Sequence, residues 1–132
     1  VNMVQKRLQK ENGLKEEIVP PSIDKDEASG LLLVCWGSSK GAVRESAARL
    51  SKKGQSVATI HFSQVWPLNP EHFLHLLQSA EKVVCVESNA KGQLARLIRC
   101  ETGFEIKHLL LRYDGLPLTP EYIMQKISDL GL

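Results

Sequence analysis

From residue 31 onward, apolar runs of strand length alternate with segments whose apolar residues recur at helical spacing. The first strand-like run is "LLLVCW" (31–36). The segment after it, "KGAVRESAARLSKKG", places Val43, Ala47 and Leu50 on one helix face and has Gly54 as a stop signal. The same alternation occurs three more times. The later strand runs are "SVATIHF" (56–62), "KVVCVE" (82–87) and "KHLLLRY" (107–113), and the later helical segments begin near Asn69, Gly92 and Thr119.

This alternation with short connections predicts a three-layer α/β/α sandwich around a mostly parallel sheet. Continuous apolar runs such as 31–36 are typical of strands covered on both faces. We expect 56–62 on one side of 31–36 and 82–87 on the other, which makes 31–36 the central strand. The point where the strand order reverses then lies between 31–36 and 82–87, and open α/β sheets bind ligands beyond the carboxyl ends of such a pair.

The first 29 residues do not show this alternation of strand-like and helical segments. "VNMVQKRLQKEN" has Met3, Val4 and Leu8 at helical spacing among cations and predicts a helix with little to pack against. An acidic stretch with Pro20–Pro21 follows, and "EEIV" (16–19) before the prolines is a candidate edge strand. We therefore divide the chain into a linker helix and connecting segment (1–29) and an α/β domain (30–132).

Composition and charge narrow the function classes. The 132 residues fit one domain, and 17 basic against 15 acidic residues give a net charge of +2, with no basic stripe of the kind that binds nucleic acid. No apolar run approaches the ~20 residues of a membrane span. The three cysteines form no C-x-x-C pair, and Cys35 and Cys85 lie in apolar runs, so we interpret them as buried thiols of a cytoplasmic protein.

Two turns follow the central strand pair and are candidate sites. "WGSSKG" (36–41) resembles a phosphate-binding turn, with small residues and a lysine before a helix, but matches neither common glycine-rich fingerprint. The structural alternative is that Gly37 makes a tight turn and Ser38 or Ser39 caps the helix. That alternative is favoured over an anion site from this turn alone.

The second turn, "ESNAKGQ" (87–93), has more polar groups than a turn needs. Ser88 or Asn89 would cap the helix, and Glu87 stands at least three residues before it. Glu87 and Gln93 are then surplus to the turn and free to hold a partner or a neighbouring domain. On this interpretation, Glu87→Ala leaves the stability of the domain nearly unchanged. A solvated strand-end acid is the alternative, and the residues alone favour neither.

Other chemistry has weaker support. His72 and His75 are spaced i, i+3, but no third ligand is near in sequence, so we predict no metal site. His61 and His108 have no serine or cysteine nucleophile beside them, so a hydrolase triad is not supported. Trp66, in the loop after 56–62, is expected to cover the sheet edge.

Four stretches together resemble one known family. They are "LLLVCWGSSKGAVRESAARL", "HFSQVWPL", "VVCVESNAKGQLARLIRCETG" and "LLLRYDGLPLTPEYI". In order and spacing they are similar to the carboxyl-terminal domain of the alpha subunit of 2-oxoacid:ferredoxin oxidoreductases, with the 2-oxoglutarate (KorA-like) branch closest. The leading "MVQKRLQK" is similar to the helix that joins this domain to the preceding one.

The resemblance implies a transketolase C-terminal domain-like fold, with five strands and "EEIV" as the antiparallel edge strand. It also implies a parent enzyme that oxidatively decarboxylates a 2-oxoacid to an acyl-CoA and reduces ferredoxin, using thiamine diphosphate, Mg²⁺, coenzyme A and iron–sulfur clusters. This chain has neither a G-D-G…N-N segment for thiamine diphosphate nor a cysteine run for a cluster. We therefore expect a non-catalytic domain that binds none of these cofactors and is inactive alone.

The partners implied are the remainder of the alpha subunit, a thiamine-binding beta subunit with optional gamma and delta subunits, and ferredoxin through the complex. Where the family has E-N-N-x-x-G-Q, this chain has Ser88 in place of the first amide. No catalytic or metal-binding residue is expected. An interface or ligand crevice is expected at Gly37, Ser38, Ser39, Lys40, Gly41, Glu87, Asn89, Gly92 and Gln93. A free-standing module that binds a phosphate-containing ligand, with Lys40 and Lys91 beside two helix starts, is the alternative, and a thiol redox protein is a third and weaker one.

Overall fold

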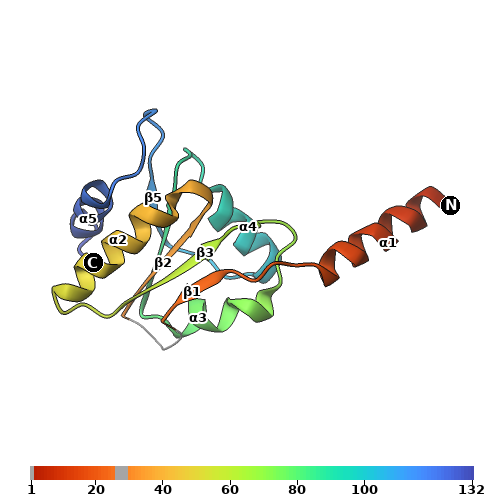
Figure 1. Ribbon diagram of the computed structural model, residues 1–132, viewed down its shortest axis with the longest axis horizontal. Coiled ribbons are helices and arrows are strands. Elements are labelled where there is room, and N and C mark those ends of the chain that lie inside the picture. The colour runs from red at the N-terminus through yellow and green to blue at the C-terminus, as the bar shows by residue number, and fades with distance from the viewer. Residues whose placement is uncertain (1, 26–29) are drawn as a thin grey trace.

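Five strands form one sheet in the order β1-β3-β2-β4-β5, with helices on both faces, in the computed structural model (Figure 1). The structure describes residues 2–25 and 30–132. The strands are β1 (Ser22–Asp24), β2 (Leu31–Trp36), β3 (Val57–Phe62), β4 (Lys82–Glu87) and β5 (His108–Leu111). The helices are α1 (Asn2–Glu16), α2 (Lys40–Lys52), α3 (Leu74–Ser79), α4 (Gln93–Thr102) and α5 (Pro120–Asp129), with short 3₁₀ turns η1 (Gly37–Ser39) and η2 (Pro70–His72).

The central position predicted for the first apolar run is confirmed. β2 pairs in parallel with β3 on one side and with β4 on the other, and β5 pairs in parallel with β4. Only β1 is antiparallel, with Ser22 opposite His61 on β3. The fold is thus the predicted three-layer sandwich with one antiparallel edge strand.

The predicted location of that edge strand is wrong. It was expected at 16–19, before the prolines, whereas β1 follows them at Ser22–Asp24. Glu16 still belongs to α1, and the Val19 N–H donates to the side chain of Gln64 at 2.8 Å instead of to a strand. Pro20 and Pro21 have no N–H to donate, so ladder pairing starts only after them.

Two apolar layers hold the helices to the sheet. Side chains alternate between the two faces of each strand, so neighbouring residues such as Leu32 and Leu33 enter different layers. One layer packs against α3 and α4 and includes Leu32, Val34, Ile60, Phe62, Phe73, Leu77, Cys85, Leu94 and Ile98. The other packs against α2 and α5 and includes Leu33, Cys35, Val43, Ala47, Val84, Val86, Leu110, Ile123 and Ile127.

The helical segments after Asn69 and Thr119 begin where predicted, with one interruption, and a side chain caps each start. The Asn69 side chain accepts a hydrogen bond from the Glu71 N–H, and the Thr119 hydroxyl accepts one from the Tyr122 N–H. The segment after Asn69 is not one helix, because Phe73, at φ −149°, separates η2 from α3. Phe73 leaves helical geometry at the position where its ring is fully buried, edge-on against Phe62.

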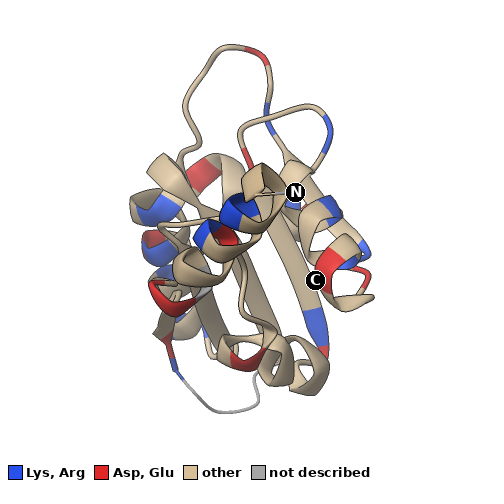
Figure 2. Cartoon of the chain, turned by 90° about the vertical axis from the view of Figure 1, so that its right-hand side faces the viewer, with Lys and Arg blue, Asp and Glu red and all other residues tan. Residues whose placement is uncertain are grey.

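The helix α1 projects away from the sheet (Figure 1), and its described side chains are exposed. In the described part of the chain, no helix is long and apolar enough to cross a membrane. The division of the chain between residues 29 and 30 stays a prediction. Figure 2 shows acidic and basic segments interspersed along the described part of the ribbon.

Candidate functional site

The turns after β2 and β4 meet at the carboxyl ends of the two central strands. Between them lies a crevice of about 200 Å³, which we call the switch-point crevice. It is lined by Trp36, Gly37, Ser38, Ser39, Ser88, Asn89 and Gln93. The structure therefore brings the two predicted turns together, because parallel neighbouring strands end at the same edge of the sheet.

Glu87, the last residue of β4, is completely buried (0% exposed) and organises the turn that follows it. Its side-chain oxygens accept hydrogen bonds from the backbone N–H groups of Leu94 at 2.7 Å and Ala95 at 3.4 Å. These are N–H groups of the first turn of α4, which have no partner within the helix. Glu87 therefore caps α4 from seven residues upstream, because the turn folds the helix start back over the end of β4.

Three further donors reach the same carboxyl group. The indole Nε1 of Trp36 donates at 3.0 Å, the amide nitrogen of Asn89 at 3.1 Å, and the Cys85 thiol at 3.5 Å. The interpretation of Glu87 as surplus to the turn is therefore wrong. A buried polar group must be matched by hydrogen bonds, and here all five donors come from this chain itself.

Asn89 and Gly92 complete the turn. The Asn89 side-chain oxygen accepts from the N–H groups of Lys91 at 3.1 Å and Gln93 at 3.3 Å, so of the two capping candidates, Ser88 and Asn89, it is Asn89 that binds the first N–H of α4, although the N-cap position itself is Gly92. Gly92 has φ +61°, and a Cβ there would lie 3.1 Å from Leu109 Cδ1. The turn thus requires glycine both for its backbone conformation and for space.

The turn after β2 is built differently. Gly37 has φ +62°, as a tight turn requires, but neither Ser38 nor Ser39 caps α2 through its side chain. The buried Ser39 hydroxyl instead donates back to the Trp36 carbonyl at 2.7 Å. The His61 ring donates through Nε2 to the Gly37 carbonyl at 2.8 Å, so a neighbouring strand fixes this turn.

Several side chains at the switch-point crevice remain available. Ser38, Ser88 and Gln93 are exposed, and their side chains make no hydrogen bond within the described residues. Lys40 is half-buried and Lys91 exposed, and neither forms an ion pair within residues 2–25 and 30–132. Hydroxyl, amide and ammonium groups of this kind can hydrogen-bond a polar surface segment that enters the crevice.

Trp36 and Ser88 line the crevice but were not among the residues expected there, and Trp36 has the larger structural role. Its ring is half-buried between the switch-point crevice and a neighbouring apolar hollow of about 90 Å³, lined also by Val65, Leu94 and Leu97. An indole followed directly by the turn glycine at a strand end was the available signal. Its N–H needs a partner when buried, and Glu87 provides one.

Cys35 and Cys85 are buried, as predicted. Burial raises the pKa of Cys35 to about 12, and the positive charge of nearby Lys40 opposes that rise. Burial, and secondarily the Glu87 carboxyl, raises the pKa of Cys85 well above its ordinary value. Cys100 is exposed. Protonated buried thiols are poor nucleophiles and poor metal ligands.

The remaining sequence candidates do not assemble into sites. No group of three or more His, Cys, Asp or Glu side chains in the described residues could hold a metal ion. His75 is exposed, and Trp66, at 52% exposed, does not cover the sheet edge as predicted. Val65 and Leu68, on either side of Trp66 and Pro67, pack against the core in its place.

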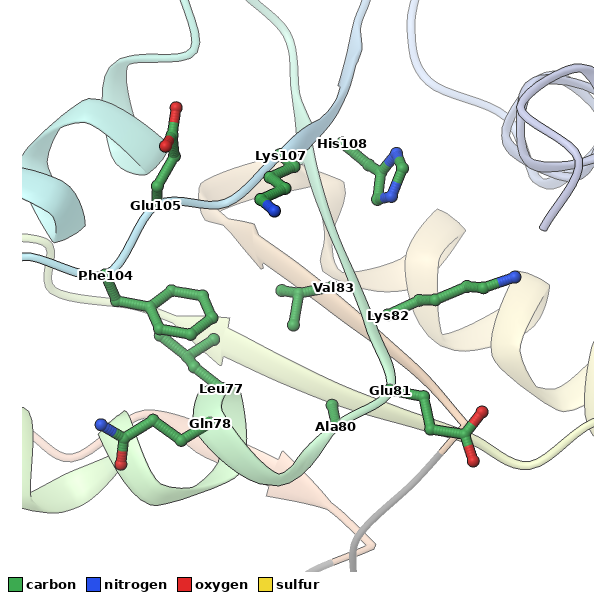
Figure 3. Close-up of a pocket in the computed structure, with 10 residues that line it drawn as sticks. All are labelled: Leu77, Gln78, Ala80, Glu81, Lys82, Val83, Phe104, Glu105, Lys107 and His108. Atoms are coloured by element: carbon green, nitrogen blue, oxygen red, sulfur yellow. The ribbon is translucent and has the colours of Figure 1, made fainter.

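A second hollow, of about 300 Å³, lies at the opposite, amino-terminal end of the sheet (Figure 3). Its charged lining residues have mixed signs. Figure 3 shows Glu81 and Lys82 extending to one side of it and Glu105 to another, where Arg99 forms an ion pair with Glu105 at 3.3 Å. Because these groups do not converge on one point, the switch-point crevice is the stronger candidate site.

Comparison with known proteins places the fold in a family. The model of the transketolase C-terminal domain matches residues 22–100, beginning at the first residue of β1. The chain is 31% identical to 2-oxoacid:ferredoxin oxidoreductase 1, subunit alpha, of Aeropyrum pernix, over 80% of this chain and 17% of that protein. It is 37% identical to the 2-oxoglutarate oxidoreductase subunit KorA of Mycobacterium tuberculosis, over 60% of this chain and 12% of that one.

Comparison with solved structures leads to the same group of proteins. The 2-oxoglutarate:ferredoxin oxidoreductase of Magnetococcus marinus superposes with a TM-score of 0.84 at 29% identity, over 96% of this chain and 22% of that chain. The alpha chain of a probable 2-oxoacid ferredoxin oxidoreductase from Thermoplasma acidophilum superposes with a TM-score of 0.59 at 28% identity, over 84% of this chain and 96% of that chain. The matching region thus makes up nearly all of the Thermoplasma chain.

The chain spans only 17% and 20% of the length of the first two curated relatives, so it corresponds to one domain of such a subunit. Both the matched family model and the relatives' alpha subunits lead to the same conclusion: the chain belongs to the transketolase C-terminal domain family, in the form found in 2-oxoacid:ferredoxin oxidoreductase alpha subunits.

Proposed function

We propose that this chain is a non-catalytic domain of a 2-oxoacid:ferredoxin oxidoreductase and that its switch-point crevice meets another domain or subunit of that enzyme. The parent enzyme would convert a 2-oxoacid, with 2-oxoglutarate favoured over pyruvate, to an acyl-CoA and pass electrons to ferredoxin. Support comes from the match to the Magnetococcus enzyme, whose structure holds 2-oxoglutarate, coenzyme A and succinyl-CoA, and from the similarity to KorA. The parent enzyme would use thiamine diphosphate, Mg²⁺, coenzyme A and iron–sulfur clusters bound outside this domain.

The interface proposal rests on a difference between the side chains at the crevice: some are hydrogen-bonded within their own turn and others are not. Glu87 and Asn89 are engaged by their own turn, whereas Ser38, Ser88 and Gln93 line the same space without a side-chain hydrogen bond in the described residues. Glu87 therefore would not touch a partner directly; it would hold Gln93 and the start of α4 in position. Family membership does not favour the alternative of a free-standing phosphate-binding module.

Reconstitution tests this proposal. Residues 1–132 alone should show no 2-oxoacid-dependent reduction of a viologen dye, and the alpha subunit containing them should be active only with its beta subunit. The double substitution Ser38→Ala, Gln93→Ala should weaken association of the subunits by about tenfold, or roughly 1.4 kcal/mol. The same change should leave the melting temperature of the isolated domain within about 2 °C, because both side chains are exposed.

The matched control is Gln55→Ala, an exposed glutamine outside the crevice, which should affect neither quantity. Turnover by residues 1–132 alone would refute a non-catalytic role. Undiminished association of the double variant would refute the interface role of the crevice. Tight binding of inorganic pyrophosphate to residues 1–132, measured by calorimetry, would support the phosphate-binding alternative.

A further inference from the structure

The two edges of the sheet differ in how their backbone is protected. β1 is three residues long, follows Pro20 and Pro21, and ends at Asp24 beside Lys25. Short length, proline and charge are the usual protection of a sheet edge against pairing with another chain. β5, at the opposite edge, reads "HLLL", with no proline and no acidic or basic side chain apart from His108, and its Leu109 is 39% exposed.

The free backbone groups on β5 can be identified from its pairing with β4. The Arg112 N–H donates to the Glu87 carbonyl at 3.0 Å, and backbone groups alternate sides along a strand. The N–H and C=O groups of Leu109 and Leu111 therefore point away from β4. Within residues 2–25 and 30–132, no hydrogen bond from another strand or loop reaches them.

A groove of about 560 Å³ runs along this edge. Its lining includes every residue from Leu109 to Asp114, together with Ala90, two residues of α5, Tyr122 and Lys126, and Leu130, which directly follows that helix. Tyr113 is 71% exposed and Leu130 is 43% exposed. The groove is therefore open to a chain that would lie beside β5, with apolar surface along it.

The two sides of the groove differ in chemistry. Leu110 is buried in the layer under α5, so Leu109 and Leu111 face the α4 side, where a Cβ added at Gly92 would lie 3.1 Å from Leu109 Cδ1. On the α5 side, the Arg112 guanidinium is already engaged by Asp114 at 3.0 Å and lies 4.2 Å from the Tyr122 ring centroid. Lys126 has no ion pair within the described residues, so the remaining charge on that side is positive.

We propose that the β5 edge binds an extended segment of a partner protein as a sixth strand, with alternating apolar and acidic side chains. The apolar side chains would cover Leu109 and Leu111, and the acidic ones would face Lys126. Main-chain hydrogen bonds to an open sheet edge are a recurrent mode of peptide recognition. A second copy of this chain fits less well, because antiparallel β5 pairing would place both lysine-bearing α5 helices on one face of the joined sheet.

This inference does not rest on the proposed function, because the groove uses a different edge of the sheet from the switch-point crevice. Its test uses a defined probe, an acetylated and amidated octapeptide of alternating valine and glutamate, titrated into the ¹⁵N-labelled chain. The amides of Leu109 and Leu111 should shift and exchange more slowly with solvent. A valine–lysine peptide of the same length should bind about tenfold more weakly.

Two variants locate the binding. Leu111→Pro removes an outward N–H and keeps the Arg112 bond to β4, so it should weaken the glutamate peptide about tenfold, whereas Leu111→Val should change its affinity less than twofold. Lys126→Gln should lower the affinity for the glutamate peptide about threefold and should not lower the affinity for the lysine peptide. If Leu111→Pro does not fold, as judged by circular dichroism, Lys126→Gln and the amide exchange decide the question.

Three results would overturn the proposal. They are absence of any shift at about 1 mM peptide, shifts confined to the switch-point crevice, and sedimentation of the native chain as a dimer with the Leu109 and Leu111 amides protected. Subunit association in the reconstituted enzyme is a separate readout, so the proposed function can fail while this binding persists, and the reverse.

Discussion

The two turns that form the switch-point crevice reach the same edge of the sheet by opposite means. After β4, a buried carboxyl group accepts five hydrogen bonds and fixes the start of α4. After β2, the turn is fixed mainly by the backbone, through a glycine in the left-handed region, a serine bonded back to Trp36 and a histidine from β3. Two similar polar turns can thus be stabilised differently, one by a single buried carboxyl group and the other by its backbone conformation and neighbouring residues.

The largest test of this difference is Glu87→Ala. We expect the free energy of unfolding to fall by about 3 kcal/mol, because five donors lose their acceptor in a fully buried place. The melting temperature of the isolated chain should fall by roughly 10 °C. Gln93→Ala, an exposed neighbour on the same turn, is the matched control and should cost less than about 0.5 kcal/mol. Equally small losses of unfolding free energy for both variants would show that Glu87 does not stabilise the turn.

The two turn glycines give a second test, since Gly37 and Gly92 share nearly the same φ, +62° and +61°. Alanine at either position meets the left-handed penalty of about 1 kcal/mol. At Gly92 the new Cβ also lies 3.1 Å from Leu109, whereas at Gly37 nothing lies within 4 Å. We expect Gly92→Ala to lower the free energy of unfolding by about 2 kcal/mol and Gly37→Ala by about half of that. Denaturant titration measures both, and a larger loss at Gly37 would contradict this reading of the turns.

Ser39→Ala is expected to have a smaller effect. It removes one hydrogen bond, from the buried hydroxyl to the Trp36 carbonyl, and should lower the free energy of unfolding by about 1 kcal/mol. Ser38→Ala, next to it and exposed, should be neutral within about 0.5 kcal/mol. The comparison is informative because the sequence does not distinguish these adjacent serines.

The thiols before the two turns offer a test with no change in sequence. The folded state raises the pKa of Cys35 to about 12 from an ordinary 9.0 and also raises that of Cys85, so both stay protonated in the folded chain. The contribution of Cys35 to stability is complete below pH 9 and is lost as the pH rises toward 12. Ellman's reagent at about pH 8 should therefore modify Cys100 in the native chain and all three cysteines after unfolding. Labelling of Cys35 or Cys85 in the native chain, located by mass spectrometry, would contradict the burial.

Local patterns were sufficient for much of the fold. Alternation of strands and helices and the Asn69 and Thr119 helix starts follow from preferences that involve a few adjacent residues. The edge strand was misplaced because a short segment of mixed apolar and acidic residues lies on each side of the prolines, at 16–19 and at 22–24. Only pairing with β3 distinguishes them.

For the candidate site, the sequence determined which residues lie at the carboxyl ends of β2 and β4, because alternation of strands and helices fixes where each strand ends and favours parallel pairing. It could not determine what those residues do. Whether Glu87 is free or fully engaged depends on donors from positions 36, 94 and 95, which approach it only when the sheet and α4 pack together. The same holds for β5, whose exposed edge and neighbouring Lys126 come from separate elements. Tertiary structure decided these roles because hydrogen bonding and burial depend on distances in space, which local sequence patterns do not encode.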